Sequence, residues 1–243
     1  MKPEDQKSAV YLIPTAASAK RMAPPVSLSR QSNLSRQYLW AAEFFRSQAD
    51  EIEKRGPTTD STIVSEHRSF VTGAIFSAVA FLEASVNEFF KDLTEEQTSS
   101  SAVLSEGTRR TLRILWNVTE GSNRSPFAIL DKYELILKCC GKEAFERKEQ
   151  PYKDADLVLQ LRNALTLYKP GGEQYRFLDD FRSKFKENGL LPAGKGAYFP
   201  EKCLGSGCAG WVVKSIKKFT DEFFWKLGVS NTLCGSGKRK KAR

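Results

Sequence analysis

Three polar groups on apolar, helix-like stretches are the residues of this sequence best suited to chemistry. Arg162 and Asn163 are adjacent in LQLRNALTLYKPGG, a run that ends at Pro170, and Tyr168 lies between the pair and that break. A guanidinium in apolar surroundings either extends to the surface or forms paired hydrogen bonds with a carboxylate or a phosphate. A tyrosine can donate a hydrogen bond or stack on a base. On spacing alone, a structural role is the more economical interpretation of each group.

The third group is Glu83 with Asn87, in FLEASVNEFF. These residues are four apart, so on a helix they share one face. A carboxylate among apolar neighbours needs a partner. The pair is either the solvated edge of an amphipathic helix or a buried pair that receives an arginine. Under the second interpretation, we expect Glu83 to receive Arg162 across a helix–helix contact, and Arg162 beside a helix end to be able to bind phosphate.

Other catalytic patterns are absent from the sequence. It has no Gly-rich phosphate loop, no dinucleotide-binding glycine motif and no nucleophile elbow. His67 is the only histidine, which makes histidine-based triads and metal sites difficult to assemble. We expect it to be a surface residue at a helix start. The five cysteines have irregular spacing, so we expect free thiols in a reducing cytoplasm, with no metal and no cofactor.

Charge is distributed unevenly along the chain. The net charge is +9, but the last six residues, KRKKAR, carry +5, residues 1–36 carry +4, and residues 37–237 are neutral. A basic tail either adds salt-sensitive attraction to phosphates or is simply solvated. The longest apolar run, 71–82, is too short to span a bilayer, and Pro14 interrupts the apolar part of the N-terminus. We therefore expect neither export nor a membrane partner.

Helical periodicity predicts the elements that carry these groups. In 61–93 one apolar stripe runs along the helix, and its small residues, including Gly73, Ala78 and Ser85, permit a close helix neighbour. The first helix is predicted from about 33 to 55, with Leu34, Tyr38, Ala41, Phe45 and Ile52 on one face. Another helix is predicted between Ser125 and Gly141, with Ser125 as its N-cap and Pro126 as its first helical residue. Further helices are predicted at 107–119, 154–167, 173–188 and 209–227, and 189–208 is predicted to be a loop.

The predicted fold class is all-α, a single helical bundle of about six or seven helices. We expect a loose N-terminal segment at 1–30, a helical domain at 31–228 and a basic flexible tail at 229–243.

Taken together, the Glu83 helix, the Arg162-Asn163 pair and the helical pattern resemble the HEPN superfamily over about 61–228. Many members are metal-independent ribonucleases in which an arginine, followed by a polar residue, precedes a histidine by four to six residues. The resemblance implies that Arg162 contacts phosphate, that Asn163 orients it, and that Glu83 with Asn87 supports the arginine. The sequence is also similar to a group of bacterial HEPN-like proteins. Since HEPN domains often dimerise, the resemblance implies a homodimer or a HEPN-like partner.

The sequence departs from this pattern at one position, because Tyr168 stands where the histidine should fall. A tyrosine hydroxyl ordinarily loses its proton only near pH ~10, so it is a poor general base at neutral pH. We therefore expect an RNA-associated protein of the toxin or defence type whose endoribonuclease activity is weakened or lost. One alternative is a non-catalytic module that pairs with itself, or with a HEPN-like partner, through the small residues of 61–93. Another is a helical interaction protein in which Arg162 and Glu83 form a core ion pair.

Overall fold

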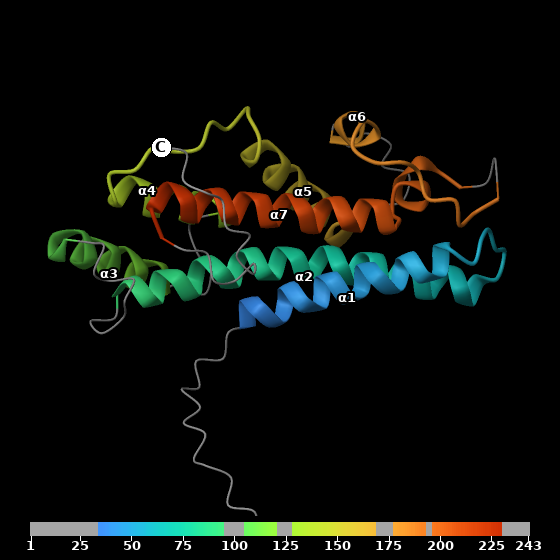
Figure 1. Ribbon diagram of the computed structural model, residues 1–243, viewed down its shortest axis with the longest axis horizontal. Coiled ribbons are helices and arrows are strands. Elements are labelled where there is room, and N and C mark those ends of the chain that lie inside the picture. Colours follow the sequence, from blue (N-terminus) through green and yellow to red (C-terminus); the bar gives the residue numbers. More distant parts are fainter. Residues whose placement is uncertain (1–33, 95–104, 121–127, 169–176, 193–195, 230–243) are drawn as a thin grey trace, which may run out of the picture. The chain divides into compact units, whose positions relative to one another are not determined.

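The computed structural model describes residues 34–94, 105–120, 128–168, 177–192 and 196–229 (Figure 1). The chain divides into two units, 1–32 and 33–243, and every described residue belongs to the second. The predicted loose segment 1–30 lies outside the described residues, as does the predicted tail apart from Val229.

The described residues form helices joined by turns and loops, and they contain no strand. The elements are α1 (Leu34–Glu53), α2 (Ser61–Thr94), α3 (Glu106–Glu120), α4 (Ile129–Cys139), α5 (Tyr152–Thr166), α6 (Phe177–Arg182), the short π-helix η2 (Tyr198–Lys202) and α7 (Ser206–Leu227). The all-α fold class predicted from the sequence is therefore confirmed.

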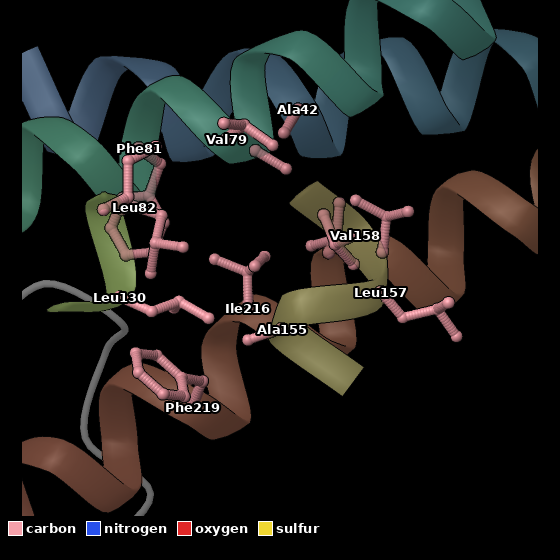
Figure 2. Packing of buried hydrophobic residues seen from close by; sticks show 14 of the residues in the cluster. Ala42, Val79, Phe81, Leu82, Leu130, Ala155, Leu157, Val158, Ile216 and Phe219 are labelled. Atoms are coloured by element: carbon pink, nitrogen blue, oxygen red, sulfur yellow. The ribbon is translucent and has the colours of Figure 1, made fainter. Parts of the chain in front are cut away.

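The long helix α2 is the centre of the bundle. It packs against α1, α7, α3, α5 and α4, and Figure 1 shows α1, α2 and α7 lying side by side. Every residue of the predicted α2 stripe is buried: Val71, Ala74, Ile75, Ala78, Leu82, Ser85, Phe89 and Leu93. In Figure 2, side chains from α2, α4, α5 and α7 meet in one cluster, which includes Leu82, Leu130, Val158 and Ile216. Because α2 has neighbours on several sides, its apolar stripe is buried along its whole length.

The small residues of α2 are used within the chain. A Cβ atom added to Gly73 would lie 3.0 Å from the ring of Phe45 on α1, so the glycine lets α1 approach closely. Ala78 and Ser85 are buried as well. The face that the sequence suggested for a partner subunit is thus largely covered by the chain's own helices.

The predicted inner face of α1 was partly wrong. Leu34 and Tyr38 are exposed, whereas Leu39 and Ala42 are buried together with Ile52. The reason is that α1 contacts both α2 and α7, so its buried face is set by two neighbouring helices. The predicted face assumed a single apolar stripe.

Glutamates from neighbouring helices cap two helix N-termini. Glu88 on α2 accepts hydrogen bonds from the backbone N–H (3.0 Å) and the hydroxyl of Ser35 at the start of α1. Glu53 at the end of α1 accepts one from the backbone N–H of Ser206 at the start of α7, at 2.6 Å. A carboxylate there satisfies free backbone donors and opposes the positive end of the helix dipole.

Some predicted boundaries differ from those observed. The predicted cap at Ser125 and Pro126 lies outside the described residues, and α4 is observed from Ile129, with an N-cap, Ala128, that makes no side-chain capping bond. Of the predicted helix 173–188, residues 173–176 lie outside the described residues, and within 177–188 the α-helix is limited to Phe177–Arg182. The predicted loop 189–208 contains η2 and the first residues of α7.

By length and composition, the part of α2 from Ser61 to Leu93 could cross a membrane. Half of its most apolar window is buried inside the protein, as in the core helix of a bundle. The unbroken apolar run 71–82 is too short to show this property, which belongs to the helix as a whole.

Candidate functional site

α5 carries the Arg162-Asn163 pair. The helix ends at Thr166, and the backbone N–H of its C-cap residue, Leu167, donates a hydrogen bond to the carbonyl of Asn163 at 2.8 Å. Near its start, the carboxylate of Asp154 is buried and lies 2.9 Å from the ammonium of Lys184, in the segment after α6. This ion pair and the packing on α2 and α7 fix where Arg162 lies.

Arg162 is partly buried, and its guanidinium has no partner among the residues that the structure describes. Its Nε is buried and makes no hydrogen bond. None of the ion pairs or side-chain hydrogen bonds between described residues involves the guanidinium, and only the backbone carbonyl of Arg162 is used, by Thr166. A buried polar atom without a partner costs about 1–3 kcal/mol, so its retention calls for an explanation.

The expected Glu83–Arg162 ion pair is not formed. Lys132 on α4 takes the place of the arginine: its ammonium lies 3.0 Å from Oδ1 of Asn87 and 3.7 Å from Oε1 of Glu83. Lys132 is 8% exposed, whereas the side chain of Glu83 is 48% exposed. The polar pair on α2 therefore does receive a cation, as its residue types suggested, but the cation comes from α4. Glu83 and Asn87 do not support Arg162.

Asn163 and Arg162 point in different directions, although they are adjacent. Asn163 is exposed and Arg162 is partly buried. Successive residues on a helix are about 100° apart, so a pair at the edge of the buried face divides between protein and solvent. Asn163 is thus available to a ligand in solution but makes no contact that orients the guanidinium of Arg162.

Tyr168 lies just beyond the end of α5 and is 47% exposed. Its ring centroid is 6.3 Å from that of Phe199 in η2, with the ring planes 54° apart. Tyr168 follows Arg162 by six residues in the chain and lies two residues beyond the last residue of α5, Thr166. The exposed ring therefore comes shortly after the guanidinium along the chain.

His67 was expected at the surface but is buried, with 1% exposure. Its Nε2 lies 2.7 Å from Oε1 of Glu53, which also receives the backbone N–H of Ser206. The hydroxyl of Ser206 donates to the other carboxylate oxygen at 2.6 Å. Both the histidine and the serine thus bond to the carboxylate, so this group is not arranged as a nucleophile activated by a histidine.

The same contacts set the acidity of Glu53. Burial alone would raise the pKa of its carboxyl, but the hydrogen bonds from His67 and Ser206 outweigh burial, and the pKa lies below its usual value. The carboxylate is charged at neutral pH. It connects the end of α1 to the start of α7 and to His67 near the start of α2. We interpret it as a structural junction.

Three residues of α6 and η2 were not singled out from the sequence, and one of them, Phe199, contacts Tyr168. Tyr198 and Phe199 belong to η2, and Arg182 lies at the end of α6. The guanidinium of Arg182 is 4.7 Å from the centroid of the Tyr198 ring, and the Tyr198 hydroxyl is buried without a hydrogen-bond partner. Burial raises the pKa of Tyr198 to about 12, so the hydroxyl stays protonated. The available signal was an aromatic pair, YF, inside a Gly- and Pro-rich stretch.

The described cysteines are free thiols: Cys139, Cys140, Cys203 and Cys208. Burial raises the pKa of Cys203 to about 12, which makes it a poor nucleophile. Within the described part of the chain, no group of three or more histidine, cysteine or acidic side chains is arranged to hold a metal ion.

The arrangement at the end of α5 is suited to holding an anion. It offers a guanidinium that no carboxylate of the described residues pairs with, an exposed amide and an exposed aromatic ring. It offers no histidine, because the only one in the chain is buried at the Glu53 junction.

We compared the chain with protein-family models, with curated proteins and with solved structures, and none of them matches it.

Proposed function

We propose that this protein binds RNA at the end of α5, as a HEPN-like protein of the toxin or defence type, and that Arg162 contacts a phosphate. The observation that carries this proposal is the unpaired guanidinium of Arg162, whose Nε is buried without a partner. Arginine donors in partly dry surroundings form strong, paired hydrogen bonds with phosphate. A phosphate at this position would bind the terminal nitrogens of the guanidinium, because the Nε itself is buried.

Cleavage of RNA is the weaker part of the proposal. Attack by a ribose hydroxyl on the neighbouring phosphate needs a group that moves protons near neutral pH. His67 is enclosed with Glu53, and Tyr168 occupies the position where the resemblance would place a histidine. We therefore propose binding as the present role, with cleavage weakened or lost. The proposed setting is the cytoplasm.

The test measures binding and cleavage of single-stranded RNA in EDTA by wild type, Arg162→Ala, Arg162→Lys and Tyr168→His. We expect wild type to bind without cutting. Arg162→Ala should lose about tenfold or more in affinity, because a charge-assisted phosphate contact is removed, and Arg162→Lys should recover part of it. Cleavage by Tyr168→His alone would indicate an intact site without its proton carrier. Cleavage by wild type would show that tyrosine suffices.

Arg110→Ala is the matched control. Arg110 is an exposed arginine on α3, a helix that packs on α2 and α4. A purely non-specific interaction would weaken equally when either arginine is removed. If no protein binds RNA while all remain folded by circular dichroism, the proposal fails.

A specific observation favours a second candidate function, a homodimerisation module. Trp40 and Phe44 on α1 stack at 5.3 Å with parallel rings, and Trp40 is 66% exposed. Large aromatic side chains on a surface are typical of interface centres. A second copy would therefore pair through α1 rather than through the small residues of α2. Sedimentation of wild type and Trp40→Glu tests this alternative, which requires a dimer that the substitution dissociates.

A further inference from the structure

We propose that Tyr168 is a stacking platform for an unpaired base, so that the ligand of the Arg162 site is single-stranded rather than duplex RNA. This inference rests on the proposed function and names its substrate class. In single strands, base faces are free to stack on aromatic rings, whereas in duplexes they are covered by neighbouring bases.

The first argument is the way Tyr168 is held. Phe199 lies against it at 6.3 Å, and Phe199 in turn meets Phe177 of α6 edge to face at 6.1 Å. Phe177 packs at 5.2 Å on Phe181, which is fully buried. A chain of ring contacts therefore connects the exposed Tyr168 to the core. A ring held in this way loses little conformational freedom when a base stacks on it.

The second argument is the support of η2, which positions Phe199. The side-chain amide of Asn188 donates to the backbone carbonyls of Glu201 and Lys202, at 2.8 and 2.9 Å. The carboxylate of Glu201 pairs with Arg68 on α2 at 3.3 Å. These polar contacts hold the segment that carries Phe199. They therefore fix the position of the Phe199 ring beside Tyr168.

The third argument is charge. Arg182 is exposed, and its guanidinium is held over the Tyr198 ring without a carboxylate partner among the described residues. Tyr198 adjoins Phe199 in the chain, and Phe199 contacts Tyr168, so η2 links this cation to Tyr168. Arg162 on α5 is a second arginine without a carboxylate partner among the described residues. Aromatic rings combined with cations that follow a phosphate backbone are the combination that binds single strands.

The experiment measures fluorescence anisotropy of three labelled probes: a short oligouridylate, the same oligomer with abasic ribose in place of its nucleotides, and a duplex RNA. The proteins are wild type, Tyr168→Leu, Tyr168→Phe and Arg162→Ala. We expect Tyr168→Leu to weaken oligouridylate binding by about tenfold and to leave the abasic probe unchanged, because only the stacked base is lost. Tyr168→Phe, which keeps the ring, should bind as wild type does.

Two further variants sharpen the result. Tyr38→Leu removes an exposed tyrosine from α1 and should have no effect. Arg182→Leu should weaken the oligouridylate and the abasic probe by the same factor and lower the salt dependence of binding by about one phosphate contact.

The outcomes separate this inference from the proposed function. If Arg162→Ala weakens binding while Tyr168→Leu does not, or if wild type binds the abasic probe as tightly as the oligouridylate, stacking is refuted and phosphate binding stands. Tighter binding of duplex than of single strand also refutes it. If wild type binds none of the probes, both proposals fail.

Discussion

Two polar regions of this bundle are opposite in how their hydrogen bonds are satisfied. At the junction of α1, α2 and α7, the carboxylate of Glu53 receives bonds from His67 and from both the backbone and hydroxyl of Ser206. At the end of α5 and in η2, the Nε of Arg162 and the hydroxyl of Tyr198 are buried and unpaired. A polar group whose bonds are complete stabilises the fold, whereas one whose bonds are incomplete costs stability and is retained for another reason.

The largest expected effect is at the satisfied junction. Glu53→Ala should lower the free energy of unfolding by about 3 kcal/mol, because it leaves His67 and the first N–H of α7 without their acceptor. Urea unfolding followed by circular dichroism measures this change. Glu51→Ala, an exposed position on the same helix, is the control and should change stability little. Equal effects of the two would contradict the structural role of the junction.

The next comparison is between two basic side chains. Lys184→Met should cost about 2 kcal/mol, since it leaves the buried carboxylate of Asp154 unpaired. Arg162→Met should cost nothing or raise stability by up to about 1 kcal/mol, since it removes an unsatisfied donor and keeps the apolar stem. Thermal melts of both variants test this. A fall in melting temperature for Arg162→Met by several degrees would show that the arginine is a structural residue.

Two tyrosines provide a smaller version of the same test. The hydroxyl of Tyr133 donates to the carbonyl of Leu82 at 2.7 Å in the core, whereas the hydroxyl of Tyr198 is buried without a partner. Tyr133→Phe should cost about 1 kcal/mol, and Tyr198→Phe should be neutral or slightly stabilising. Chemical unfolding of the two variants under one set of conditions compares them directly. The reverse order would show that the Tyr198 hydroxyl is satisfied in solution.

The smallest expected effect is on pH dependence. The pKa of Glu53 is lowered in the folded protein, with burial opposing the hydrogen bonds, so only part of their effect remains. A lowered carboxyl pKa contributes stability that is present above the usual value of 4.5 and is lost as pH falls through the folded value. The stability difference between wild type and Glu53→Gln should therefore shrink on acidification below that value. A constant difference between pH 7 and pH 3 would contradict this.

The sequence predicted the helices that carry the candidate site residues better than it predicted the contacts of those residues. α5 was expected at 154–167 and is found at Tyr152–Thr166, because its apolar period and its flanking breakers are local signals. The partner of Glu83 was predicted wrongly. Choosing between Arg162 and Lys132 required knowing that α4 lies beside that part of α2, and no local pattern in either helix contains this information.

His67 and Phe199 illustrate the same limit. Histidine is intermediate in how often it is buried, so its type did not decide its exposure, and the meeting of α1 and α7 with α2 encloses this one. Phe199 lies in a stretch whose glycines and prolines predict a loop. Its position beside Tyr168 depends on Asn188 and Glu201, which hold η2 in place.

By itself, the sequence determined that this protein is an all-helical bundle, and Arg162 and Tyr168 stay a prediction for where its chemistry lies. Helical period, capping residues and breakers act within a few residues, and a single chain displays them in full. Only the tertiary structure decided which polar groups are satisfied. Hydrogen-bond partners such as Glu53 and Ser206, or Lys132 and Asn87, are separated by tens of residues and are brought together by packing alone. Within the described part of the chain, the same packing left the Nε of Arg162 without a hydrogen-bond partner.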